Sequence, residues 1–97
     1  MGNELIGKQK ERMPVLYDLK DPKEGEILLC ESGIVVRAGD SFQSPFNYVE
    51  SITVGRRLNL GKMEAYMVAY DVMGGKHTLE FAINESYLHA LKKACGK

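Results

Sequence analysis

The sequence predicts a mainly β domain, in which a strongly bent antiparallel sheet or partly open barrel of about six or seven strands is capped by one C-terminal helix. Three observations support this prediction. Short runs rich in β-branched and aromatic residues alternate with clusters of turn-forming residues along most of the chain. Residues 84–95 have an amphipathic helical pattern. A chain of 97 residues has room for a single core.

The N-terminal region divides into a tail and a first strand. Residues 1–12 are polar and mixed in charge, and we expect a polar N-terminal tail before a single domain at 13–97. The apolar run MPVLYDL at 13–19 predicts a strand, and Pro14 predicts an edge position because proline has no N–H for a ladder. We see neither a signal peptide nor a stretch of roughly 18 apolar residues that would span a membrane, so we expect a cytoplasmic protein.

Two hairpins are predicted in the body of the chain. The runs ILLC and IVVR, within 26–40, are separated by Glu-Ser-Gly, which suits a tight turn. A short strand, a corner near Pro45 and a strand at 51–55 follow. The runs EAYMVAYDV and HTLEFAI flank Gly74 and Gly75, which suit a type I′ turn because both tolerate positive φ. Alternation in this hairpin predicts two core-facing sets: Tyr66, Val68, Tyr70 and Val72 on one strand, and His77, Leu79, Phe81 and Ile83 on the other.

The last segment carries helix signals at both ends. Asn84 is a suitable N-cap, and Gly96 suits the position just after the helix. Leu88, Leu91 and Cys95 follow helical spacing and form one apolar stripe. We therefore expect this helix to pack on the open end of the sheet.

Composition and motifs exclude several functions. The 13 basic and 13 acidic side chains cancel, which removes the general basis for nucleic-acid binding. Cys30 and Cys95 belong to no C-x-x-C pair, and His77 and His89 have no partner at a metal-ligand spacing, so we expect no metal and no cofactor. Neither a nucleophile elbow nor an acid–base pair is recognisable. We expect no catalytic residues, no small-molecule substrate and no enzyme.

The stretch VGRRLNLGKME at 54–64 raises the question of a phosphate site. A P-loop needs four residues between its glycines and a hydroxyl residue after its lysine. Here five residues separate Gly55 from Gly61, Met63 follows Lys62, and the next segment is predicted to be a strand instead of a helix. We therefore reject nucleotide binding.

The same stretch has two other interpretations. Arg56, Arg57 and Lys62 form a basic hairpin loop with Leu58 and Leu60 between them. In a purely structural interpretation, the cations keep an edge soluble and the leucines tuck under the sheet. In a functional interpretation, the loop contacts anionic headgroups or an acidic patch on a partner.

Aromatic residues suggest a second contact surface. Tyr66, Tyr70 and Phe81 are expected in the core. The aromatic corner around Pro45 is expected to be partly exposed and available to a partner, and it consists of Phe42, Phe46 and Tyr48.

The order of these runs resembles a known family. GEILLCESGIVVRAG, SPFNYVESITVGRRLNLGK and EAYMVAYDVMGGKHTLEFAI, followed by the helix, are similar to the pleckstrin-homology-like domains of bacteria and archaea, including GRAM-type modules. In this pattern residues 44–49 form the corner, 52–54 a strand, Gly61-Lys62 the end of a loop, and 84–95 the capping helix. The resemblance covers about 13 to 96.

The resemblance implies the family's fold and a binding role. Such domains bind phosphoinositides or proteins and rarely catalyse, and some archaeal taxis accessory proteins that look similar act as protein adaptors. The Lys-x-n-Arg-x-Arg signature of the lipid-binding members is absent here. Lys20 and Lys23 lie in the matching loop, but Arg37 stands alone on a later strand.

These observations lead to two main hypotheses. The first is a non-enzymatic interaction module that binds a protein partner or self-associates through the aromatic corner and the basic loop. The alternative is weak peripheral binding to anionic lipid or phosphoinositide headgroups. The residues expected to contact the anion are Arg56, Arg57, Lys62, Lys20 and Lys23. A third possibility, an enzyme, would need a deep polar pocket that holds perturbed acids or bases.

Overall fold

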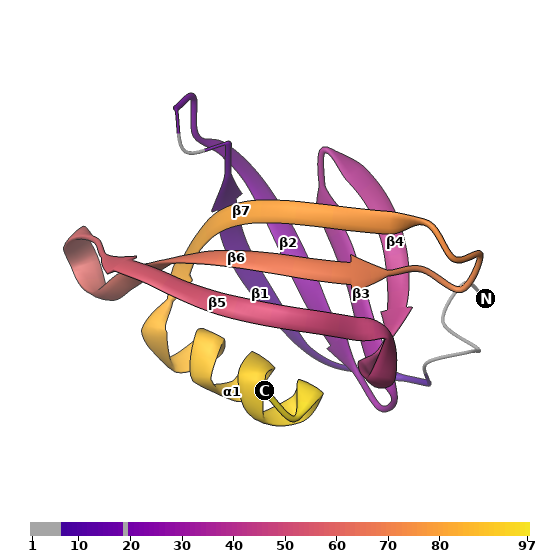
Figure 1. Cartoon of the computed structure of the whole chain (residues 1–97). Helices are drawn as coiled ribbons and strands as arrows, with labels where there is room; N and C mark the ends of the chain where they lie inside the picture. Colours follow the sequence, from indigo (N-terminus) through magenta and orange to yellow (C-terminus); the bar gives the residue numbers. More distant parts are fainter. Residues whose placement is uncertain (1–6, 19) are drawn as a thin grey trace.

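The computed structural model describes residues 7–18 and 20–97, and within them seven strands form one antiparallel sheet that is followed by a helix (Figure 1). In chain order the elements are β1 (Gln9–Tyr17), β2 (Lys23–Cys30), β3 (Gly33–Ala38), β4 (Asp40–Pro45), η1 (Phe46–Tyr48), β5 (Val49–Arg57), η2 (Asn59–Gly61), β6 (Lys62–Tyr70), β7 (Lys76–Asn84) and α1 (Glu85–Cys95). The predicted mainly β fold with one C-terminal helix is confirmed.

Two antiparallel meanders make up the sheet. Strands β1 to β4 form the first meander and β5 to β7 the second, and the strand order is β4-β3-β2-β1-β7-β6-β5. β1 joins the meanders by a short pairing with β7, from Val15 opposite Ile83 to Tyr17 opposite Phe81. Because this contact is short, the meanders are free to fold over one another, and Figure 1 shows their strands crossing in two layers. The core lies between the layers.

Apolar side chains from both meanders fill the core. The largest fully buried ones are Phe81, Met13, Ile27, Ile34, Met67, Ile83 and Leu91. Each such side chain contributes about 1.5–3 kcal/mol to the free energy of folding by leaving water. A smaller apolar cluster of Leu28, Cys30 and Val35 lies on the opposite face of β2 and β3. Burial there raises the pKa of the Cys30 thiol.

Helix α1 has the predicted caps and the predicted buried stripe. The side-chain oxygen of Asn84 accepts a hydrogen bond from the Ser86 amide at 3.0 Å, and Gly96 ends the helix with a φ of 72°. The buried residues of the helix are Leu88, Leu91 and Cys95. They pack against β6, β7 and η1, and burial raises the pKa of Cys95 to about 11. In the described part of the chain, no helix is long and apolar enough to cross a bilayer.

The prediction for β1 is wrong in two respects. The strand begins at Gln9, so part of the predicted polar tail belongs to the sheet, while residues 1–6 of that tail and residue 19 lie outside the described residues. β1 is also a central strand between β2 and β7 and does not lie at an edge. Pro14 is tolerated because the pairing with β7 starts only at Val15, so β2 alone is hydrogen-bonded to β1 at the proline.

The predicted core face of β7 is correct, but that of β6 is wrong. The buried residues on the core face of β6 are Ala65, Met67 and Ala69. Tyr66, which we expected inside, is 41% exposed. The pairing explains the difference, because Ala65 lies opposite Phe81 and a small residue there leaves room for the phenyl ring.

The loop between β6 and β7 is wider than the predicted two-glycine turn. Only Gly74 has a positive φ, of 87°, while Gly75 does not. Asp71 organises the loop instead, because its Oδ1 accepts hydrogen bonds from the amides of Met73 and Gly75, each at 2.9 Å. A carboxylate that caps nearby amides is a common alternative to a tight turn.

Candidate interaction surface along β5

β5 forms one edge of the sheet and pairs with β6 alone. Among the described residues, the Val49 amide donates a hydrogen bond to the Phe46 carbonyl, and no turn or loop hydrogen bond reaches residues 50–57. The strand contains no proline, and its side chains from Thr53 to Arg57 are exposed. Such an edge presents unpaired N–H and C=O groups, and it is able to pair with a further strand.

β4, at the other edge, is shorter and tied to the second meander. The buried Ser44 hydroxyl donates a hydrogen bond to the Tyr70 carbonyl at 2.8 Å. The Phe42 ring stacks on His77, with 4.0 Å between ring centroids and 8° between the ring planes. Pro45 then ends the strand. The two edges therefore differ, and β5 is the longer one.

His77, which stacks on Phe42, also contacts the β6–β7 loop. Its Nε2 lies 2.7 Å from Oδ2 of Asp71. The hydrogen bond from His77 and then that from the Gly75 amide hold the pKa of Asp71 below its usual value. His77 is thus a hydrogen-bonded structural histidine, and His89 is exposed on α1. No group of three or more His, Cys, Asp or Glu side chains in the described residues is placed to hold a metal ion.

Only part of the predicted aromatic corner is exposed. Phe42 and Phe46 are half-buried and pack against the main core. Tyr48 is 41% exposed and directly precedes β5. Tyr48 is therefore the member of the corner that offers an aromatic surface to a partner.

The predicted basic loop lies at the other end of β5, and its arginines are paired. Arg57 donates to both carboxylate oxygens of Glu85, at 3.0 Å and 3.2 Å. Arg56 lies 3.7 Å from Glu64, and its side chain is 83% exposed. Lys62 belongs to none of the ion pairs among the described residues. Exposed pairs of this kind add little stability, but they offset the positive charge of the loop.

Leu60 stands at the tip of this loop in an unusual conformation. Its φ is 63°, in the left-handed region, and the residue is 90% exposed. The expectation that the leucines tuck under the sheet is therefore wrong for Leu60, whereas Leu58 is half-buried. A left-handed conformation costs a residue with a Cβ atom about 1–2 kcal/mol.

A hollow of about 420 Å³ lies between this loop and the β1–β2 turn. Its lining includes Leu16, Pro22, Leu58, Leu60, Lys62 and Ala82. Lys20 and Lys23 are exposed on either side of Pro22, so the structure brings both predicted lysines to the same end of the molecule as the basic loop. This loop hollow has an apolar floor and a rim of mixed charge.

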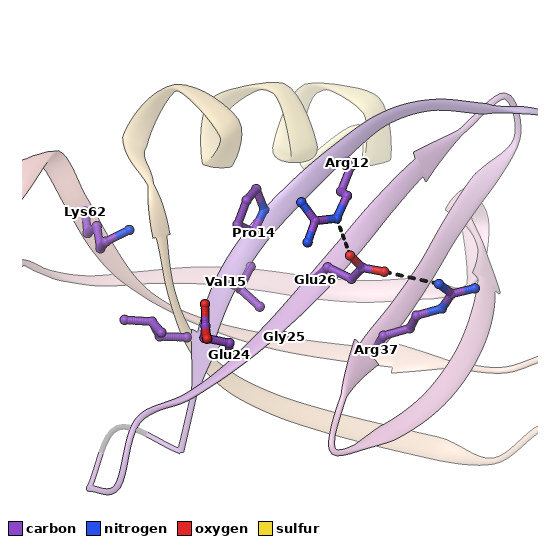
Figure 2. A pocket seen from close by; sticks show the side chains of 9 residues that line it. Arg12, Pro14, Val15, Glu24, Gly25, Glu26, Arg37 and Lys62 are labelled. Atoms are coloured by element: carbon purple, nitrogen blue, oxygen red, sulfur yellow. Dashed lines mark hydrogen bonds and ion pairs between the residues drawn. The ribbon is translucent and has the colours of Figure 1, made fainter.

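A second hollow, of about 520 Å³, adjoins the first at Lys62 (Figure 2). Glu26 bridges Arg12 and Arg37 there, and the Nη1 of Arg37 lies 3.1 Å from Glu26. The hydrogen bond from Arg12 is the main cause that lowers the pKa of Glu26. The sequence did not reveal this chain of charges, because the three residues are distant until the register places Glu26 opposite Arg37.

The two predicted contact surfaces do not form one site. Tyr48 precedes the first residue of β5, and Arg56 and Arg57 are its last residues. Nine residues of strand separate the two ends by roughly 30 Å. The free edge of β5 connects them. Sequence reasoning missed this edge, although a proline-free strand with Glu50 near its start and arginines at its end was a visible signal.

The fold and this surface define a class: a small mainly β domain with a capping helix, in which β5 is an edge strand among the described residues. The chain is similar to a crystal structure of the C-terminal domain of an unknown protein from Leishmania infantum. The TM-score is 0.60 at 9% sequence identity, and the match covers 93% of this chain and 85% of that one. At this identity the likeness shows the fold alone. No protein-family model matches the chain, and no curated protein matches it in sequence.

Proposed function

We propose that this domain is a non-enzymatic, pleckstrin-homology-like module that binds a protein partner. The topology supports the family assignment. The short helix η1 at the corner, strand β5, the β5–β6 loop and the C-terminal helix follow in the order that the sequence resemblance implies. Its two cysteines are free and buried thiols, which favours a reducing compartment such as the cytoplasm.

The arrangement of exposed apolar side chains along β5 carries the proposal. Tyr48 is 41% exposed before the strand, Val54 is 38% exposed within it, and Leu60 is 90% exposed just beyond it. Protein interfaces combine such apolar and aromatic anchors with a polar rim. Unpaired edge strands add main-chain hydrogen bonds to an incoming segment. β5 offers both features together.

The interior supports a binding role without catalysis. Among the described residues Ser44 is the buried polar side chain, and its hydroxyl donates a hydrogen bond to the Tyr70 carbonyl. Two carboxylates have a lowered pKa, and partners on neighbouring strands or in the β6–β7 loop account for both shifts: Arg12 and Arg37 for Glu26, and His77 and Gly75 for Asp71. Glu26 lines the second hollow, but its two carboxylate oxygens are held by Arg12 and Arg37.

Affinity capture with matched variants tests the proposal. Leu60→Asp places a charge where the proposed partner covers an apolar side chain, so we expect retention of a partner from cell extract to fall by about tenfold or more. Met73→Asp is the control, because Met73 is 89% exposed at the tip of the β6–β7 loop, away from the β5–β6 loop. Equal retention by both variants and the wild type would contradict the proposal.

Weak binding to anionic lipid is the second candidate. It is favoured by Leu60, which stands exposed among Arg56, Arg57 and Lys62. Each cation near an anionic surface adds about 1 kcal/mol, but Glu64 and Glu85 offset two of these cations. In liposome sedimentation at two salt concentrations, lipid binding would fall with salt and vanish in an Arg56→Glu, Arg57→Glu variant. The protein-binding proposal expects no sedimentation at physiological salt.

A further inference from the structure

We infer that the partner of the β5 edge is a second copy of this chain, which pairs antiparallel with the first through its own β5. The inference rests on the proposed function and deepens it by naming the partner. Three features of β5 carry it: the charge order along the strand, the apolar side chains at its two ends, and the availability of those groups in the single chain.

The charge order of β5 is self-complementary in the antiparallel sense. The strand reads VESITVGRR, with Glu50 near its start, Arg56 and Arg57 at its end, and uncharged residues between them. A two-fold axis at Thr53 brings the arginine end of one β5 to the Glu50 end of the second copy, and the symmetry repeats this approach. Parallel pairing would set like charges against each other. The strand therefore favours antiparallel pairing with itself.

The ends of β5 are complementary under the same axis. Leu58 and the exposed Leu60, just beyond the end of β5, come to the end of the ladder where Tyr48 of the second copy precedes its β5. The two largest exposed apolar groups at the ends of the strand would thus meet each other, once at each end of the ladder. This contact accounts for a leucine that is both exposed and left-handed in the single chain.

The groups needed for the pairing are available. Glu50 is exposed and belongs to none of the ion pairs among the described residues. The acidic members of those pairs are Glu26, Glu64, Asp71 and Glu85. Arg56 makes only a long contact of 3.7 Å, which it can exchange. Glu50 and Arg56 are therefore available to face a second copy, whereas Arg57 stays paired with Glu85.

The irregular register of β5 limits the ladder to the middle of the strand. The β5–β6 register shifts between Val49 and Ser51 and again between Val54 and Arg57. The regular part, Ser51 to Val54, surrounds the proposed axis at Thr53. Because bulges twist the ends of an edge strand, the ladder between copies is short. We therefore expect a modest dissociation constant of about 1 to 100 µM.

Sedimentation velocity of the full chain from about 1 to 500 µM tests the pairing. The expected result is a reversible monomer–dimer equilibrium. Glu50→Arg places arginine against arginine and should raise the dissociation constant by about tenfold or more. The double variant Glu50→Arg, Arg56→Glu restores opposite charges in the dimer and should return the constant to within about threefold of the wild type. Failure of this rescue would overturn the inference.

A cysteine cross-link tests the axis itself. Thr53→Cys brings two thiols together at the axis, at the distance that a disulfide needs, and should give a covalent dimer under mild oxidation. Thr78→Cys, at an exposed position on β7, is the matched control and should stay monomeric. Equal cross-linking of both variants would contradict the proposed pairing.

The inference and the proposed function fail separately. A chain that stays monomeric at all concentrations, yet loses capture of another protein in Leu60→Asp and not in Met73→Asp, refutes self-pairing and keeps the proposed function. A monomeric chain whose Leu60→Asp variant captures as much protein as the wild type refutes both.

Discussion

Leu60 combines a left-handed backbone conformation with an exposed apolar side chain. A leucine at the tip of a loop leaves its side chain in water and adopts a backbone conformation that favours glycine. The residue is better explained by a contact outside the single chain.

Leu60→Gly separates stability from binding. Relief of the left-handed strain, less the greater entropy loss of glycine, should raise the free energy of unfolding by about 0.5–1 kcal/mol. The same variant should weaken self-association and partner capture because the apolar contact is lost. Urea unfolding and sedimentation of the same sample measure both quantities. A loss of stability would show that Leu60 supports the fold and not an interface.

Asp71 gives a prediction for pH. The His77 hydrogen bond and the Gly75 amide lower its pKa in the folded state below the usual 3.8. A lowered folded-state pKa means that the charged form is stabilised by folding, so this stabilisation is complete above the unfolded-state pKa and is lost as the pH falls through the lowered value.

The variant Asp71→Asn removes this charge and keeps an oxygen that accepts from a loop amide. We expect it to lower the free energy of unfolding at neutral pH, and we expect the difference from the wild type to shrink as the pH falls below about 3.8. Urea unfolding at several pH values measures the difference. A difference that is constant with pH would show that the charge of Asp71 has no such role.

At the scale of elements, local signals were sufficient for α1 and insufficient for the sheet. The helix was predictable because its caps and its apolar stripe lie within thirteen consecutive residues, 84 to 96. The faces of β6 were not, because Ala65, Met67 and Ala69 alternate with Tyr66 and Val68, and both sets are apolar. Which set faces the core depends on Phe81 across the ladder, which the β6 sequence alone does not contain.

The edges of the sheet were likewise not predictable from local sequence signals. Pro14 suggested that β1 is an edge strand, but the short β1–β7 pairing starts just after it. The real edges, β4 and β5, are separated in the sheet by all the other strands, although η1 alone separates them in sequence. Order along the chain did not reveal that Glu50, Arg56 and Arg57 share one free edge.

The N-cap of α1 offers a test at this scale. Asn84→Ala removes the acceptor for the Ser86 amide and should lower the free energy of unfolding by about 1 kcal/mol. Asn84→Asp keeps an acceptor at this position and should stay close to the wild type. Chemical denaturation of both variants measures the effect. Equal losses in the two variants would show that the hydrogen bond at Asn84 is not what stabilises the start of the helix.

At the scale of the whole molecule, the proposed binding function rests on a packed interior and on the edge strand β5 of the described residues. Fifteen buried apolar residues from both meanders and α1 share the main core. The surface features that favour binding lie along β5, where an unpaired backbone edge, charges of opposite sign at the two ends and exposed apolar side chains occur together. The predicted fold class was correct because it follows from the number and pattern of the runs. The surface needed the strand order, which only the structure supplies.

Hydrogen exchange of the β5 amides at low and high protein concentration tests the central claim most directly. In dilute protein the amides of Ser51 to Val54 that point away from β6 should exchange rapidly, and at concentrations that favour the dimer they should become protected, while β4 stays unchanged. Protection of these amides that is already complete in dilute monomer, or that does not change with concentration, would contradict the account.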